Sequence, residues 1–341
     1  MKRYKFSTLK RIVDRYGRKK ILVVGDLLLD QYVEGKVSRI SPEAPVPVLW
    51  ARRERYVPGG ACNVACNLAS LGARVSLVGV VGGMPENDGR TAILKGLLRE
   101  RGIGVDGLVT DKTRKTILKT RVMADHHPHH QQIVRIDRED LHPISPATFR
   151  EIKRNIISSI KEIDAVIIED YGKGLITSRL LKEVIGMARA EGKLIAVDPK
   201  ENHFSYYRNI SVITPNRYEA EKAVGFPLAD RDALHKGGYK LLRDLNADVV
   251  LITLGEEGMM VFRRDREPAV IPTLAREVFD VSGAGDAVIG VYTLSRVSGA
   301  DILKAAHMAN CAAGIVVSHT GTAPVAKTDL INELKERAGR R

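Results

Sequence analysis

The sequence predicts an α/β fold in which a mostly parallel β-sheet is flanked by helices on both faces. Continuous apolar runs rich in Val, Ile and Leu, which are typical of strands buried on both faces, recur along the 341-residue chain. Helical stretches separate these runs, and this alternation is typical of a parallel sheet. Two other segments, 32–57 and 114–137, alternate polar and apolar residues and predict antiparallel strands outside the main sheet.

The individual elements follow from this alternation in chain order. The apolar runs predict strands at 21–26, 75–82, 165–170, 194–199, 211–215 and 249–255. Helices are predicted at 61–71, 88–101, 147–161, 178–191, 217–224, 231–245, 284–297 and 301–317, with a terminal amphipathic helix at 327–340. The segments 32–57 and 114–137 are similar in character, so they can pair into a small second sheet. We therefore interpret residues 1–341 as one domain.

The cysteines and the lack of long apolar runs favour a reducing compartment. The chain has three cysteines, Cys62, Cys66 and Cys311, an odd and small number that argues against a disulfide framework. No apolar run is long enough to span a membrane. The basic N-terminal residues lack the apolar segment of a secretory signal. We therefore expect a cytoplasmic protein without a membrane partner.

The net charge leaves the class of partner open. The formal charge of +13 would attract any polyanion, including nucleic acid. The Lys and Arg residues are spread along the chain, however, and no basic motif interleaved with aromatic residues is visible. A small phosphorylated substrate would equally favour a positive field, so charge alone does not choose between the two.

The strongest functional motif is the segment Asp280–Asp286, which reads DVSGAGD. Small residues at 282–285 allow backbone N–H groups to converge where a helix is predicted to begin, and a helix N-terminus favours an anion. Asp286 falls in the first turn, so a carboxylate lies beside an anion site, as phosphoryl transfer with a general base requires. The alternative is a glycine-rich helix start whose acidic residue only complements the helix dipole.

Two segments supply polar groups suited to sugar hydroxyls. Gly59 and Gly60 allow a ligand to approach the backbone, and Asn63 offers both a donor and an acceptor. Asp26 and Asp30 lie at the end of the first predicted strand, at the edge where α/β sheets bind ligands. Taken singly, the first segment also fits a simple loop and helix start, and the second fits turn chemistry.

The segment Thr214–Glu219, which reads TPNRYE, is a candidate magnesium site. Asn216 and Glu219 are three residues apart and share a face of a helical turn, where they could hold the water shell of Mg²⁺. The same spacing is typical of a capping box, in which Asn216 caps the helix and Glu219 closes the box. Taken alone, this segment favours the capping interpretation.

A run of histidines surrounds Pro128 between two predicted strands. Its members are His126, His127, His129 and His130. Such a run can bind a metal ion adventitiously, but its position favours the exposed tip of a hairpin. The sequence assigns the run no function.

Apart from the histidine run, the motifs described above lie at 26–30, 59–63, 214–219 and 280–286. In identity and order they resemble those of the pfkB (ribokinase-type) carbohydrate kinases, and the resemblance covers about residues 20–325. The family implies a ribokinase-like fold whose lid is a small sheet made from two separated insertions, here 32–57 and 114–137. It also implies an ATP-dependent sugar kinase that uses Mg²⁺. In this family D-x-x-G-A-G-D carries the anion hole and base, G-G-x-x-N contacts the sugar, and N-x-x-E organises Mg²⁺ and phosphates.

The resemblance implies a role for each matching residue. Asp286 would be the catalytic base, and backbone N–H groups of Gly283, Ala284 and Gly285 would stabilise charge on the phosphoryl group. Glu219 would bind Mg²⁺ through water. The sugar would contact Asp26, Asp30, Gly59, Gly60 and Asn63. The nucleotide side would comprise Asn216, Arg217, Tyr218, Glu219, Thr253, Gly255, Gly258 and Asn310.

Three further segments make the resemblance more specific. Ser38–Val48, Asp170–Gly174 and Val197–Lys200 are similar to segments of the D-glycero-β-D-manno-heptose-7-phosphate kinases, which act in ADP-heptose synthesis for lipopolysaccharide core. This implies phosphorylation of the C1 hydroxyl of heptose 7-phosphate. Many such proteins continue into a nucleotidylyltransferase domain, whereas this chain ends about where the kinase does. We therefore expect a stand-alone kinase.

The partners and the alternatives complete the prediction. By charge and position, the candidates for contact with the distal phosphate are Lys119, Arg121 and Lys173. Lid edges often pair between subunits in this family, so a homodimer is expected. One alternative is the same chemistry on fructose, ribose or a keto-deoxy sugar acid. The other is a basic nucleic-acid-binding protein on a degenerate kinase fold, which the intact Asp286 and glycines argue against.

Overall fold

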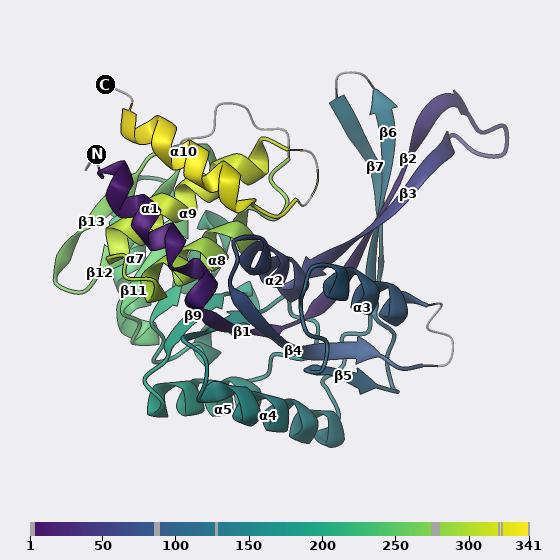
Figure 1. Ribbon diagram of the computed structural model, residues 1–341. Coiled ribbons are helices and arrows are strands. Elements are labelled where there is room, and N and C mark those ends of the chain that lie inside the picture. The colour runs from purple at the N-terminus through teal and green to yellow at the C-terminus, as the bar shows by residue number, and fades with distance from the viewer. Residues whose placement is uncertain are drawn as a thin grey trace.

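The computed structural model describes residues 4–84, 89–126, 129–273, 280–319, 321 and 323–339. Within these ranges the framework is a nine-stranded sheet with the order β13-β12-β11-β10-β9-β8-β1-β4-β5 (Figure 1). The strands from β11 to β5 run parallel, and β12 and β13 form an antiparallel edge. The strand bounds are β1 Lys20–Gly25, β4 Arg74–Gly82, β5 Leu108–Asp111, β8 Ala165–Glu169, β9 Leu194–Asp198, β10 Val212–Ile213, β11 Val249–Thr253, β12 Met259–Arg263 and β13 Arg266–Ile271.

Strand β1 lies inside the sheet, between β8 and β4. Its side chains alternate between two hydrophobic cores, with Ile21 and Val23 in one and Leu22 and Val24 in the other. All four side chains are fully buried. A strand that is covered on both faces needs apolar residues at every position, which explains the continuous apolar run in the sequence.

Helices form a layer on each face of the main sheet (Figure 1). One layer contains α1 Phe6–Asp14, α2 Ala61–Ser70, α3 Arg90–Glu100, α8 Ala284–Val297, α9 Ile302–Val317 and α10 Lys327–Gly339, and the other contains α4 Pro146–Ile160, α5 Ser178–Ala190, α6 Arg217–Val224 and α7 Arg231–Leu245. Short 3₁₀ turns lie at Tyr16–Arg18, Glu201–Tyr206 and Gly255–Glu257. Helices α4, α5, α7 and α9 each follow a Ser, Thr or Asp whose side chain accepts an N–H of the first turn, as N-capping requires.

A second, four-stranded sheet projects from the main body (Figure 1). Its order is β3-β2-β6-β7, with bounds β2 Leu27–Ile40, β3 Pro47–Gly60, β6 Ile117–His126 and β7 His129–Arg138. The pairs β2–β3 and β6–β7 are antiparallel, as expected, but β2 and β6 run parallel. The reason is that each segment folds into its own hairpin, and the two hairpins join through their first strands.

The structure confirms the predicted fold class and adds elements that the sequence patterns did not reveal. Strands β12 and β13 and helix α1 were not predicted. The hairpin near the histidine run is present, since β6 ends at His126 and β7 begins at His129. The side chains of that run lie outside the described residues. None of the helices in the described ranges is both long and apolar enough to cross a bilayer.

Candidate active site

The start of helix α8 carries the glycine-rich motif. The helix begins at Ala284, directly after Gly283, whose φ of 80° is a left-handed conformation that glycine adopts without strain. The first turn of any helix leaves backbone N–H groups without intrahelical partners, so this turn offers donors to an anion, although the Ala284 N–H also donates to the Val281 carbonyl at 3.3 Å. Asp280 fixes the preceding turn, because its carboxylate accepts N–H groups of Ser282 at 2.9 Å and Gly321 at 3.0 Å.

The Asp286 side chain is buried in this first turn, and two side chains donate to it. Asn63 Nδ2, on α2, lies 2.6 Å from Oδ2, and the Tyr171 hydroxyl lies 3.0 Å from Oδ1. Burial raises the pKa of Asp286 to about 6, although both hydrogen bonds favour the ionised form. Burial also raises the pKa of Tyr171, so its hydroxyl stays a donor. Asp286 is therefore ionised at neutral pH and able to accept a proton.

Asp286 lines a cavity of about 180 Å³, which we call the polar cavity. Its walls come from β2, β3 and β6 of the small sheet, from α2, from the loop after β8 and from the start of α8. The lining residues are Leu28, Asp30, Gly59, Gly60, Asn63, Lys119, Arg121, Tyr171, Ser282, Gly283 and Asp286. Many of the predicted sugar-contacting residues therefore converge on one space. A few polar groups aimed into a small concave site are what a hydroxylated ligand requires.

Two positions in the wall of this cavity, 59 and 60, have no room for a side chain and therefore require glycine. A Cβ at Gly59 would lie 2.3 Å from Asp30 Oδ2. A Cβ at Gly60, whose φ is +58°, would lie 2.3 Å from Leu28 Cδ1 and 2.6 Å from the Asp26 carbonyl oxygen. Side chains at these positions would push β3 away from β2, so the glycines keep the cavity wall closed.

Asp30 and Arg121 form an ion pair across the small sheet. Arg121 Nη1 on β6 lies 2.5 Å from Asp30 Oδ1 on β2, and both side chains are largely buried. The guanidinium also lies 5.4 Å from the centroid of the Tyr32 ring, within cation–π range. The negative charge of Asp30 therefore compensates the positive charge of Arg121. This pairing leaves Arg121 less free for a phosphate than the sequence suggested.

Asp26 does not line the polar cavity, although the sequence placed it among the sugar contacts. Its carboxylate accepts backbone N–H groups of Tyr171 and Lys173 at 3.0 Å and of Leu175 at 3.4 Å. Burial raises its pKa to about 6, while these donors oppose the rise. The geometry gives Asp26 a structural role, since it holds the loop after β8.

The two lysine candidates differ in position. Lys119 lines the polar cavity, and its ammonium lies 5.5 Å from the centroid of the Tyr171 ring. Lys173 is not among the residues that line this cavity, and its Nζ donates to the Glu139 carboxylate at 2.7 Å. Burial lowers the pKa of Lys119, and the nearby Lys173 ammonium lowers it further. Of the two, Lys119 is therefore the better placed to meet an anionic group in the cavity.

A second cavity of about 410 Å³ lies on the other side of the α8 start. Apolar side chains and glycines dominate its walls, which suits a flat heterocycle. The lining residues are Thr253, Gly255, Glu256, Gly258, Met259, Thr273, Val281, Ala284, Gly285, Val288, Asn310, Ala313, Gly314 and Val317. The group includes four predicted nucleotide contacts: Thr253, Gly255, Gly258 and Asn310. The two cavities meet at the turn that carries the anion donors and Asp286.

The segment at the start of α6 forms a capping box. Asn216 Oδ1 accepts the N–H of Glu219 at 2.9 Å, and the Glu219 carboxylate accepts the N–H of Asn216 at 2.8 Å. Arg217 pairs with Glu257, whose neighbours Glu256 and Gly258 line the larger cavity, and Tyr218 is exposed. Burial raises the pKa of Glu219. The charge of Glu219 also raises the pKa of Asp198, so the two carboxylates interact electrostatically.

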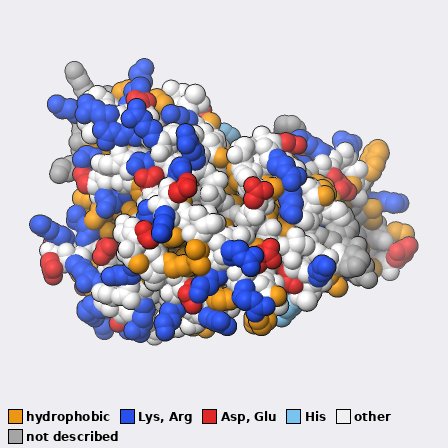
Figure 2. All heavy atoms as spheres, turned by 60° about the horizontal axis from the view of Figure 1, so that its bottom comes forward, with side chains coloured by type: hydrophobic (Ala, Val, Ile, Leu, Met, Phe, Trp, Pro, Cys, Tyr) orange, Lys and Arg blue, Asp and Glu red, His pale blue; other side chains and the backbone are white. Residues whose placement is uncertain are grey.

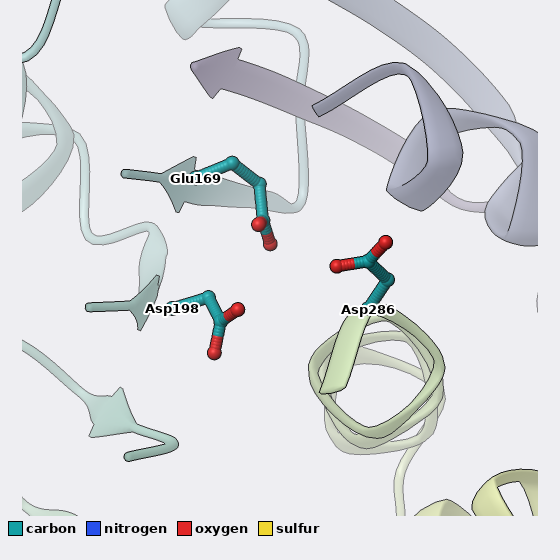
Figure 3. A group of neighbouring side chains, drawn as sticks. All are labelled: Glu169, Asp198 and Asp286. Atoms are coloured by element: carbon teal, nitrogen blue, oxygen red, sulfur yellow. The ribbon is translucent and has the colours of Figure 1, made fainter. Parts of the chain in front are cut away.

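Three carboxylates converge beside this segment. Glu169 ends β8, Asp198 ends β9, and both point toward Asp286 at the start of α8 (Figure 3). One oxygen from each lies within 4.8 Å of the others. Glu169 is fully buried, and neither of its oxygens has a hydrogen-bond partner among the residues that the structure describes. Burial and the neighbouring carboxylates raise the pKa of Glu169 and of Asp198.

This acidic cluster suits a divalent cation. Buried carboxylates repel one another, and a bound cation offsets both the repulsion and the burial of charge. Mg²⁺ prefers oxygen ligands and is typically bound by one or two carboxylates together with substrate phosphates. The buried, unpartnered oxygens of Glu169 therefore fit Mg²⁺ at this edge of the sheet.

Sequence reasoning missed three of these residues. Tyr171 and Asp198 lie in segments that carried the more specific resemblance, but no chemical role was assigned to either. Glu169 was read only as the end of a buried strand. A signal was present, since an acidic residue that ends a continuous apolar strand faces the ligand-binding edge of a parallel sheet.

The fold and the site define a class of protein. The α8 turn, with its N–H donors and the buried Asp286, lies between a polar cavity and a larger apolar one. This arrangement is typical of an enzyme that phosphorylates a hydroxylated small molecule. The family described as pfkB family carbohydrate kinase matches residues 18–329. The chain therefore belongs to the pfkB family of carbohydrate kinases. The predicted sugar kinase and its ribokinase-like fold are confirmed.

Curated relatives include two bacterial proteins called bifunctional protein HldE. The protein of Desulfatibacillum aliphaticivorans is 43% identical over 325 residues, which cover 95% of this chain and 65% of that protein. The protein of Geobacter sulfurreducens is 43% identical over 318 residues, which cover 93% of this chain and 63% of that protein. The chain thus spans slightly less than two thirds of the length of these relatives.

Solved structures share the fold at low sequence identity. Phosphofructokinase-2 from Escherichia coli in complex with potassium has a TM-score of 0.77 and 19% identity, covering 94% of this chain and 99% of that chain. Ribokinase from Arabidopsis thaliana complexed with ribose and ATP has a TM-score of 0.70 and 18% identity, covering 93% and 99% respectively. These similarities establish the fold alone.

Proposed function

We propose that this protein transfers the γ-phosphoryl group of ATP to the C1 hydroxyl of D-glycero-β-D-manno-heptose 7-phosphate, giving the 1,7-bisphosphate for ADP-heptose and lipopolysaccharide core synthesis. The observation that carries the proposal is the position of Asp286, which is buried at the wall of the polar cavity in the same α8 turn whose residues Ala284 and Gly285 line the larger cavity. A base and an anion site side by side are the parts that phosphoryl transfer needs.

Each part of the site has a role in this proposal. The sugar occupies the polar cavity, with its reacting hydroxyl on Asp286 and other hydroxyls on Asp30 and Asn63. Asp286 accepts the proton of that hydroxyl, while N–H groups of Gly283, Ala284 and Gly285 stabilise charge on the transferring phosphoryl group. The adenosine part of ATP occupies the larger cavity, with Asn310 at its wall. Both substrates thus approach the α8 turn from opposite sides.

The acidic cluster is the proposed magnesium site. Asp198 and Glu169 would hold Mg²⁺ directly, and Glu219 would hold it through water. When bound, Mg²⁺ would neutralise charge on the ATP phosphates. The residues of the chain itself, Asp286 above all, orient the reacting hydroxyl.

The choice of heptose 7-phosphate rests on relatives and charge. Proteins called bifunctional protein HldE are 43% identical to this chain. This supports the more specific resemblance found in Ser38–Val48 and Asp170–Gly174. Lys119 at the wall of the polar cavity supports a substrate with an anionic group.

Three further features belong to the proposal. The small sheet, which covers the polar cavity, would act as a lid and mediate a homodimer. A cytoplasmic location is supported by Cys62, Cys66 and Cys311, which are free and buried thiols. Figure 2 shows Lys and Arg side chains scattered over one face among acidic and apolar ones, which supports a small-molecule substrate over nucleic acid.

The test is ADP formation by the purified protein with ATP, Mg²⁺ and a panel of sugars. The panel contains heptose 7-phosphate, unphosphorylated heptose, fructose, fructose 6-phosphate, ribose and a keto-deoxy sugar acid. The proposal expects the highest kcat/KM with heptose 7-phosphate and a product phosphorylated at C1 by NMR. A higher kcat/KM for another sugar would contradict the assignment of heptose 7-phosphate as substrate, but it would still support a sugar kinase.

A further inference from the structure

Within the described residues, the side chains of Tyr171 and Asn63 donate hydrogen bonds to Asp286. The Tyr171 hydroxyl donates to Asp286 Oδ1 at 3.0 Å, while Asn63 Nδ2 donates to Oδ2 at 2.6 Å. The two donors therefore engage different oxygens of one carboxylate. Such an arrangement fixes the plane of the carboxylate as well as its position, because rotation about the Cβ–Cγ bond would break both hydrogen bonds.

The loop that carries Tyr171 is held at several points. Its own backbone N–H, with those of Lys173 and Leu175, donates to the buried Asp26 carboxylate. Within the loop, Asp170 Oδ1 accepts the N–H of Gly172 at 2.8 Å. The backbone of Tyr171 is thus fixed by groups that take no part in the chemistry. The hydroxyl is consequently presented to Asp286 from a rigid support, as a preorganised site requires.

The ring of Tyr171 also contacts the small sheet. The Lys119 ammonium, on β6, lies 5.5 Å from the ring centroid, within the range of a cation–π contact. Lys119 and Tyr171 both line the polar cavity. The ring therefore forms part of the wall between the proposed lid and the base, so a sugar in this cavity would lie against it.

The base needs this donor because its surroundings are acidic. Asp286 is buried and has an oxygen within 4.8 Å of oxygens of Glu169 and Asp198. A buried carboxylate that lacks hydrogen-bond donors is costly to ionise. Removing the hydroxyl from one oxygen would leave that oxygen free to turn away from the reacting hydroxyl. Hydrogen bonds to charged groups are the stronger class, so one such contact affects catalysis measurably.

We propose that Tyr171 is a positioning residue for phosphoryl transfer, whose hydroxyl orients the Asp286 carboxylate toward the sugar hydroxyl. The inference rests on the proposed role of Asp286 as base, but not on the identity of the sugar. Tyr171 acts through Asp286 and does not itself accept the proton. Loss of the Tyr171 hydroxyl should therefore slow the chemical step and leave substrate binding nearly unchanged.

The experiment compares Tyr171→Phe with a matched control that also removes a buried tyrosine hydroxyl. The control is Tyr16→Phe, because the Tyr16 hydroxyl lies 2.6 Å from Ser295 Oγ in the core and is not among the residues that line either cavity. Both variants are measured with the sugar that gives the parent its highest kcat/KM. We expect Tyr171→Phe to lower kcat about ten- to a hundred-fold, with KM for sugar and ATP within about two-fold of the parent. Tyr16→Phe should lower Tm without lowering kcat.

A double-mutant cycle with Asp286→Asn then tests whether Tyr171 acts through the base. If it does, Tyr171→Phe adds less than about a two-fold loss in the Asp286→Asn background, because residues that act as a unit are not additive. A full multiplicative loss in that background would overturn the proposal, as would a raised KM with unchanged kcat in the single variant. Failure of the base assignment is distinguishable, since Asp286→Asn alone would then retain activity near that of the parent.

Discussion

At the scale of single residues, Asp286 is defined by its neighbours. Its pKa is raised to about 6, first by burial, and hydrogen bonds from Asn63 and Tyr171 limit the rise. A general base works best when its pKa lies just below the working pH, because it is then ionised yet still attracts a proton. The value therefore agrees with a base that operates near neutrality.

The first prediction concerns pH. Because the pKa is raised, the ionised base predominates above about 6 and is lost as the pH falls through that value. We expect kcat/KM at saturating Mg²⁺ to be constant near neutrality and to fall roughly ten-fold per pH unit below the pKa of Asp286, which a cation bound at the acidic cluster would lower from about 6. Initial rates measured with heptose 7-phosphate check this. Asp286→Asn should lower kcat about 10²- to 10⁴-fold and lose this acidic limb while still binding ATP, and an unchanged limb in that variant would contradict the assignment.

A second residue-scale prediction ranks the magnesium ligands. Asp198→Asn should raise the Mg²⁺ concentration needed for half-maximal activity more than Glu219→Gln does, because Asp198 is in the acidic cluster whereas Glu219 is held in a capping box. Glu219→Gln should leave Tm near that of the parent, because a Gln side-chain oxygen at this position can still accept the Asn216 N–H and keep the capping box. Mg²⁺ titrations of activity and of Tm without ATP provide the two readouts. Equal Mg²⁺ requirements in both variants would contradict the role of Asp198 as a direct magnesium ligand.

A third prediction separates the two lysines. Lys119 lines the polar cavity, whereas Lys173 is paired with Glu139 outside its walls. A charge-assisted contact with a phosphate is worth roughly 1.5–3 kcal/mol, or about ten- to a hundred-fold in binding. Lys119→Met should therefore lower kcat/KM for the 7-phosphate by that factor but not for unphosphorylated heptose, and Lys173→Met should have the smaller effect. The reverse order would assign the phosphate to Lys173, as its charge and sequence position first suggested.

At the scale of elements, long apolar strands were predictable and edge strands were not. Strand β1 shows continuous burial, so its four central residues are all apolar. Strand β13, by contrast, begins with Arg266 and Glu267 at the sheet edge, where partial exposure permits polar residues and hides the pattern. Helix α1 was not predicted for a related reason, because its buried residues are only Leu9, Ile12 and Val13, within a basic segment.

The fourth prediction concerns the junction of β2 and β3. In Gly59→Ala the new Cβ would lie 2.3 Å from Asp30 Oδ2, so Asp30 must move and its ion pair with Arg121 is disturbed. Overpacking typically costs about 1–3 kcal/mol, and here it falls on the cavity wall. We expect a lower kcat/KM for the sugar and an unchanged Kd for ATP. Gly96→Ala on α3 is the control, because no atom lies within 4 Å of its added Cβ and the change should leave kinetics unaltered.

At the scale of the whole molecule, the sequence predicted the fold class better than the roles of individual residues. The α8 turn and the glycines of β3 could be found because their chemistry is local to one segment. Asp26 was predicted to contact the sugar, and its hydrogen bonds to the loop after β8 could not be foreseen, because the N–H donors belong to a loop about 145 residues later, at Tyr171. The acidic cluster likewise depends on the tertiary fold, since Asp286 on α8 joins the ends of β8 and β9 from a distant part of the chain.

The last prediction concerns assembly through the small sheet. Strand β7 is an edge of this sheet, and edge strands carry backbone groups available for pairing with another chain. Val134 and Ile136 lie two residues apart on β7, share one face, and are 47% and 41% exposed. We expect a dimer of the 37.6 kDa chain in sedimentation experiments, and Val134→Glu should shift it toward the monomer because a charge would be buried in the interface. Ile157→Glu on α4, which replaces an apolar side chain that is 50% exposed, should leave the dimer intact. A parent that sediments as a monomer, or a dimer insensitive to the change at Val134 but lost at Ile157, would assign the contact to another surface.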